Sequence, residues 1–136
     1  MNFFLRHRPV STFDVDLWVR DEELNLERVN RALHELQAQW GPTENTWAPV
    51  PADPAWLRRQ PVLCLTSPFG AIDIFRHVRG LDDYSACQAR SVPSQTAERI
   101  AYSGLSDRDM LACQLALPES ERRLDRVAYL EGIVSS

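Results

Sequence analysis

The sequence contains no lysine, because all 15 of its basic residues are arginine. This absence excludes a lysine Schiff base and the lysine of a phosphate-binding P-loop. Arginine still suits bidentate contacts with phosphate. The net charge of −4 argues against a broad nucleic-acid-binding surface. It permits a local site for one nucleotide or a tRNA end, and it suits a basic protein partner.

Long apolar runs and regularly spaced cysteines are also missing. No stretch approaches the ~20 apolar residues of a transmembrane helix, and residues 1–6 are too short and too soon charged to be a signal peptide. We therefore expect a cytoplasmic protein that does not enter the membrane. The 3 cysteines fit neither a disulfide framework nor a zinc site, and Cys64 and Cys113 lie in apolar contexts that suit buried thiols. We expect one domain, residues 1–136.

The hydrophobic pattern predicts strands and helices along the whole chain. The expected strands are 11–19, 61–66, 71–78 and 98–102, and the expected helices are 21–40, 82–89, 106–117 and one that begins at Pro118. The turn at 67–70 predicts a β-hairpin, and the proline-rich stretch 42–61 predicts a long irregular loop. This order favours an α+β fold, with a mixed β-sheet and helices packed mainly on one face.

Two aspartates of the first strand are the main functional candidates. Asp14 and Asp16 alternate with apolar residues, so both carboxylates should stand on one face of the strand. Such close charges repel each other, and a divalent cation between them would remove the repulsion. Asp73 lies in a second strand-like run, and three carboxylates on adjacent strands are what two-metal nucleotidyl transfer requires. The alternative is an ordinary amphipathic strand whose acids face solvent.

The segment Arg8-Pro9-Val10-Ser11-Thr12-Phe13-Asp14-Val15-Asp16-Leu17 resembles the acidic strand of the nucleotidyltransferase superfamily typified by DNA polymerase β. It is most similar to the small bacterial members, the minimal nucleotidyltransferases and the toxins of abortive-infection and toxin–antitoxin pairs. The later segment Gly70-Ala71-Ile72-Asp73-Ile74 resembles the strand that carries the third acid. Ser106 to Gln114 and Arg122 to Asp125 match the C-terminal helices of the family in part.

The resemblance implies a Mg²⁺-dependent transferase that moves a nucleoside monophosphate from a nucleoside triphosphate to a hydroxyl of a protein or tRNA. Asp14, Asp16 and Asp73 would be its catalytic and metal-binding residues. Three further residues, Arg8, Ser11 and Thr12, would bind the phosphates of the nucleotide. From the residues alone, Arg8 or Arg76 could contact phosphate, but a structural salt bridge with Asp14 or Asp73 is the preferred interpretation. Ser11 and Thr12 could bind phosphate or simply turn the chain into the strand.

The chain departs from the family pattern at two places. Relatives carry a helix with a Gly-Gly or Gly-Ser turn ahead of the acidic strand, but residues 1–8 contain no glycine, and Gln114 stands where many relatives have lysine. Either the natural chain begins further upstream, or the fold lacks this helix and turn. The departures favour an alternative, a catalytically degenerate binding module that pairs with an antitoxin-like partner.

Two further interpretations concern surfaces of the fold. A third hypothesis for the function is a structural subunit that forms a homodimer through an open sheet edge. The tryptophans of the proline-rich stretch, Trp47 and Trp56, are expected to anchor the loop, with base stacking as the alternative.

Overall fold

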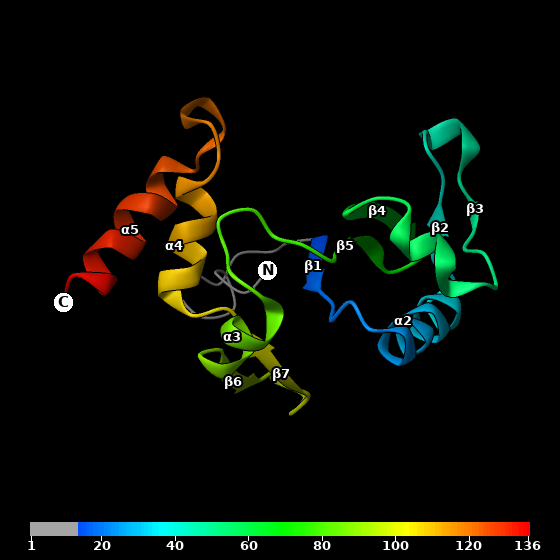
Figure 1. The fold of residues 1–136 in the computed structure, drawn as a ribbon, viewed down its shortest axis with the longest axis horizontal. Coiled ribbons are helices and arrows are strands. Elements are labelled where there is room, and N and C mark those ends of the chain that lie inside the picture. The colour runs from blue at the N-terminus through cyan, green and yellow to red at the C-terminus, as the bar shows by residue number, and fades with distance from the viewer. Residues whose placement is uncertain (1–13) are drawn as a thin grey trace. The chain divides into compact units, whose positions relative to one another are not determined.

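The computed structural model describes residues 14–136, which form an α+β fold (Figure 1). The chain divides after His77 into two compact units, and each is described by itself. The expectation of a single domain over residues 1–136 stays a prediction, because one domain can contain two compact units. None of the helices in the described part of the chain has both the length and the apolar character that crossing a membrane requires.

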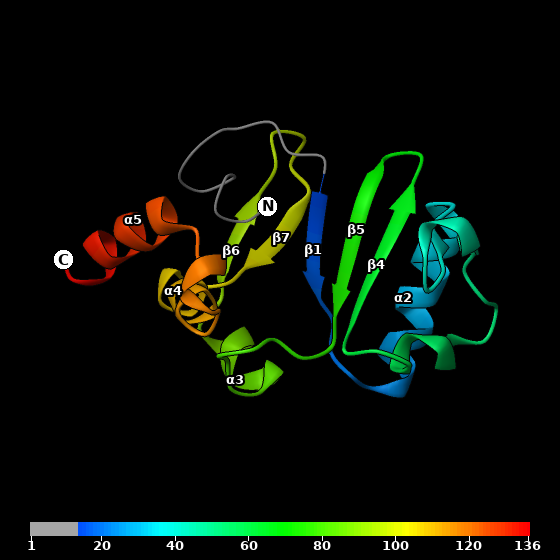
Figure 2. The ribbon, with the colours of Figure 1, turned by 90° about the horizontal axis from the view of Figure 1, so that it is seen from above.

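The first unit contains a mixed five-stranded sheet with the strand order β1-β5-β4-β2-β3. Its strands are β1 (Asp14–Trp18), β2 (Gln39–Trp40), β3 (Ala48–Pro49), β4 (Val62–Ser67) and β5 (Gly70–Phe75). The strand β1 runs parallel to β5, and the other pairs are antiparallel. Figure 2 shows β1, β5 and β4 side by side. The expected mixed sheet and the expected hairpin of β4 and β5 are therefore confirmed.

Helix α2 (Glu23–Glu35) packs on one face of this sheet. Its buried leucines share one core with alternate residues of β4 and β5, and the six residues are Leu26, Leu33, Leu63, Leu65, Ile72 and Ile74. Burying each such side chain contributes roughly 1.5–3 kcal/mol. Because side chains alternate along a strand, the residues between these core positions lie on the opposite face of the sheet.

Helix α2 ends well before Trp40, so the predicted helix 21–40 is too long. Gln37 adopts a left-handed conformation with φ 54°. The amides of Gln37 and Ala38 donate to the carbonyls of His34 and Leu33, at 3.0 and 2.9 Å. This pair of bonds is the Schellman ending, which usually has glycine at the left-handed position. The dipeptide Gly41-Pro42, whose composition is typical of a turn, follows strand β2 and does not end the helix.

The proline-rich stretch is held on α2 by one buried asparagine. It contains two short 3₁₀ helices, η1 (Glu44–Thr46) and η2 (Pro54–Arg58). Asn30 donates from Nδ2 to the carbonyls of Pro51 and Ala52, at 3.1 and 3.0 Å, and it accepts a bond of 2.7 Å from the Trp56 indole. Trp56 is only 2% exposed. It therefore anchors the loop, as expected, and a base cannot stack on it.

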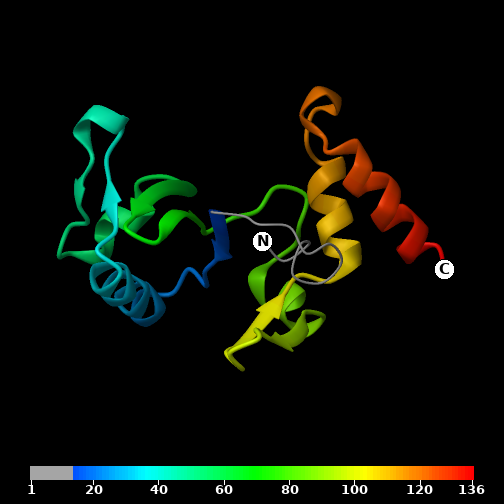
Figure 3. The same ribbon diagram turned by 180° about the vertical axis from the view of Figure 1, so that it is seen from behind.

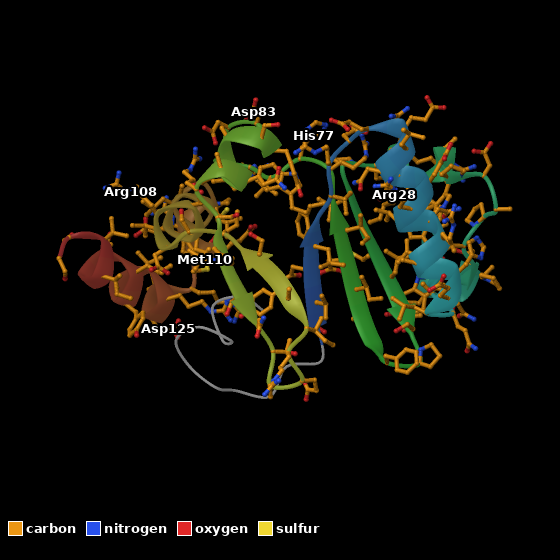
Figure 4. All side chains as sticks on the ribbon, turned by 90° about the horizontal axis from the view of Figure 1, so that it is seen from below. Arg28, His77, Asp83, Arg108, Met110 and Asp125 are labelled. Atoms are coloured by element: carbon orange, nitrogen blue, oxygen red, sulfur yellow. The ribbon has the colours of Figure 1, made fainter. Side chains whose placement is uncertain are left out.

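The second unit combines a β-hairpin with helices (Figure 3). Its elements are α3 (Tyr84–Ala89), β6 (Val92–Gln95), β7 (Ala101–Gly104), α4 (Asp107–Leu115), the 3₁₀ helix η3 (Glu119–Glu121) and α5 (Leu124–Val134). Asp83 caps α3 and Ser106 caps α4; Asp83 is labelled in Figure 4. The strand expected at 98–102 lies at 101–104. Its partner β6 was not predicted, because it contains Pro93, which is tolerated in a two-stranded sheet where each strand is an edge.

Candidate functional site

Two of the three predicted acids stand directly opposite each other on neighbouring strands. Asp16 of β1 pairs in register with Asp73 of β5, and Asp73 pairs in register with Cys64 of β4. Their side chains lie on the face of the sheet opposite α2. The residues immediately before and after Cys64 on β4 and Asp73 on β5 point the other way, into the core. We call Asp16, Asp73 and Cys64 the carboxylate row.

Asp14 lies on the same face, one row further along β1. Its register partner is Ala71, which in turn pairs with Thr66 of β4. The three acids predicted from the sequence therefore share one sheet face, as the alternation implied. The predicted phosphate-binding residues Arg8, Ser11 and Thr12 lie outside the described residues.

Cys64 is a member of this site that was not predicted from the sequence. The apolar context of Cys64 suggested a buried thiol, but the thiol is exposed. Leu63 and Leu65, on either side of it, point into the core. The period-two pattern of the strand could have revealed this, because it places Cys64 on the same face as the polar residue Thr66.

The crowding of negative charge changes the proton affinity of Asp73. Burial raises the pKa of its carboxyl, and the charges of Asp16 and Asp14 raise it further, while the neighbouring Cys64 thiol opposes the rise. Burial and the charges of Asp73 and Asp16 also raise the pKa of Cys64. Burial is the largest cause of both rises, and a bound cation would relieve the smaller part that comes from the neighbouring carboxylates.

The two carboxylates of the carboxylate row suit Mg²⁺, which prefers oxygen ligands, whereas the Cys64 thiol does not. Within residues 14–136, no three His, Cys, Asp or Glu side chains are grouped so that they could hold a metal ion by themselves. Magnesium that arrives with a nucleotide does not need such a group, since one or two carboxylates complete its shell together with substrate phosphates and water. Asp16 and Asp73 are the residues that could fill this role.

Replacing Asp73 with asparagine should stabilise the protein at pH 7. A carboxyl whose pKa is raised by folding stabilises the native state below its unfolded pKa, and this contribution is lost as the pH rises through the folded pKa. We expect an increase of about 0.5 kcal/mol in the free energy of unfolding at pH 7, the scale of a cross-strand charge pair. Urea denaturation at several pH values measures it, and the difference from wild type should shrink below pH 4.

Glu27→Gln is the control for this prediction, because Glu27 is exposed on α2 and its loss changes the net charge equally. We expect no comparable gain from it. A loss of stability in Asp73→Asn at pH 7 would contradict the electrostatic account of the row.

Arg76 follows β5 but does not pair with either acid named for it in the sequence analysis. Its guanidinium binds Asp21 at 3.0 Å and donates to the carbonyls of Arg58 and Gln60, at 3.2 and 3.0 Å. Burial raises the pKa of Asp21, but hydrogen bonds from Arg76 and Arg58 outweigh it and hold this pKa below its usual value. Arg76 therefore connects the end of β5 with the segment before α2 and with the end of η2.

Residues of the C-terminal helical motif have structural roles in the second unit. The buried carboxylate of Asp109 is bound by the Arg90 guanidinium, whose Nε donates to Oδ2 at 2.8 Å and to Oδ1 at 3.0 Å and whose Nη2 donates to Oδ1 at 2.9 Å. Gln114 accepts a hydrogen bond of 2.8 Å from the amide of Arg123, just before α5. Lysine has no acceptor atom, so the lysine of the family pattern could not make this contact.

Comparisons of the chain with models of protein families, with curated proteins and with solved structures find no match. The geometry of the carboxylate row is therefore the ground on which a function is proposed.

Proposed function

We propose that this protein is a nucleotidyltransferase that moves a nucleoside monophosphate from a nucleoside triphosphate to a hydroxyl of a protein or tRNA. The observation that carries the proposal is the register of Asp16 with Asp73 on the sheet face opposite α2. Neighbouring strands lie only about 4.8 Å apart. Two carboxylates held so close on one sheet face form a site that gains by binding a cation.

The three acids divide the work of the proposed reaction between the Asp14–Asp16 pair and Asp73. Asp14 and Asp16 would hold the metal-bound triphosphate, and bound Mg²⁺ would neutralise charge on the leaving pyrophosphate. Asp73 would assist in holding the metal or accept the proton of the attacking hydroxyl.

The position of the transferred phosphorus tests this reaction. The chain is incubated with Mg²⁺ and ATP labelled at either the α- or the γ-phosphate, together with tRNA or with the proteins of a cell extract. The proposal expects acceptor labelling from α-labelled ATP alone, because the nucleoside monophosphate is transferred and pyrophosphate leaves. Labelling from the γ-phosphate would mean phosphoryl transfer instead.

A second candidate is a catalytically degenerate module of the same fold that pairs with an antitoxin-like partner. Gln114 favours it, since its side chain is engaged in joining α4 to α5 and cannot replace a lysine at a phosphate. A homodimer through the edge strand β1 belongs to the same class of binding functions. A wild-type chain that binds nucleotide but transfers no label to any acceptor would favour this candidate.

A further inference from the structure

The row next to the carboxylate row carries two aromatic side chains. Trp18 of β1 pairs in register with Phe75 of β5, and Phe75 pairs with Val62 of β4. Trp18 and Phe75 are two residues beyond Asp16 and Asp73 on their strands, so their side chains share the face of the carboxylates. All three members of this row are half-buried, whereas the core residues of α2 lie against the other face.

The position of the Trp18 ring is fixed by its polar edge. Its Nε1 donates a hydrogen bond of 3.1 Å to the carbonyl of Arg76, the residue after Phe75. The side chain of Arg76 is itself held by Asp21 and by two backbone carbonyls. The Trp18 ring is thus held in place through Arg76 before any ligand binds. Ligand binding should therefore cost little side-chain entropy at Trp18.

This sheet face matches a ligand with one anionic, metal-binding end and one flat aromatic end. Two residues along a strand correspond to roughly 7 Å, which separates the carboxylate row from the aromatic row. We propose that Trp18 and Phe75 form the platform that binds the base of the nucleoside triphosphate, a proposal that rests on the proposed function. Stacking of a base on aromatic side chains is tolerant of base identity. Both adenine and guanine nucleoside triphosphates should therefore bind.

The experiment compares a ligand that has a base with one that has none. Calorimetry measures the affinity of the full chain for ATP and for tripolyphosphate, each with Mg²⁺, in wild type and in Phe75→Leu. We expect the variant to bind ATP about tenfold more weakly, the scale of one lost base–aromatic stack. Its affinity for tripolyphosphate should not change.

The control is a second phenylalanine-to-leucine substitution in the same hairpin. Phe69 lies in the turn between β4 and β5 and is 78% exposed, so Phe69→Leu should leave both affinities unchanged. A second measurement follows the fluorescence of the chain: ATP should quench the fluorescence of the wild type, tripolyphosphate should not, and the quenching should be reduced in Trp18→Phe.

The outcomes separate this proposal from the function beneath it. Wild type that binds neither ligand would overturn both the transferase and the platform. Wild type that binds ATP no tighter than tripolyphosphate would overturn the platform alone, and so would a Phe75→Leu variant that weakens both ligands equally. Selective weakening of ATP supports the platform.

Discussion

Replacing Asp16 with asparagine should lower the rate of nucleotidyl transfer by about a thousandfold. Asparagine keeps the size of the side chain but removes one of the two charges that face each other across β1 and β5. Charge stabilisation by a metal is worth several kcal/mol at the transition state, and about 4 kcal/mol corresponds to three powers of ten in rate. Initial rates with α-labelled ATP measure the effect.

The fold should survive this substitution, because Asp16 is exposed. Circular dichroism and the midpoint of urea denaturation check this, and Glu27→Gln on α2 serves as the control for the change in net charge. Asp14 offers an independent test of the same mechanism. An Asp14→Ala variant with full transfer activity would contradict the role that we assign to the pair.

Replacing Trp56 with alanine should lower the free energy of unfolding by about 4 kcal/mol. Removal of a buried tryptophan side chain leaves a cavity and typically costs 3–5 kcal/mol. Trp56 is 2% exposed, lies 5.2 Å from the ring of Trp40, and donates the 2.7 Å bond to Asn30. The substitution would leave the buried amide oxygen of Asn30 without its donor, which adds to the loss.

Trp47 provides the matched control in the same proline-rich stretch. It is 36% exposed, so Trp47→Ala should cost less than about 1.5 kcal/mol by comparison with the buried site. Urea denaturation followed by circular dichroism compares the two variants with wild type. Equal losses would mean that Asn30 and Trp56 do not hold the stretch on α2 as described.

The sequence was sufficient to predict the sheet face that carries the candidate site. Period two placed Asp14 and Asp16 together, and the turn at 67–70 predicted the hairpin that presents Asp73. The alternation is clear in β4 and β5 because one face of each strand enters the core. The parallel pairing of β1 with β5 could not be read from the pattern, since it depends on contacts between residues far apart in the sequence.

Other features depended on tertiary contacts that leave little trace in the sequence. The end of α2 uses Gln37 in a left-handed conformation, where glycine would have been the recognisable signal. The strands β2 and β3 have two residues each, and β2 pairs from just before the proline-rich stretch with β3 inside it, so neither strand shows a measurable periodicity. The partner of Arg76 is Asp21, 55 residues away in the chain, and proximity in sequence had suggested Asp73 instead.

The most direct test of the account is calorimetric titration of the full chain with ATP in the presence and absence of Mg²⁺. The same titration of an Asp14→Ala/Asp16→Ala double variant serves as the reference. The account predicts nucleotide binding by the wild type that requires Mg²⁺ and disappears in the double variant. Binding that persists in the double variant, or a wild type that binds no nucleotide with Mg²⁺ present, would contradict a metal–nucleotide site on this face of the sheet.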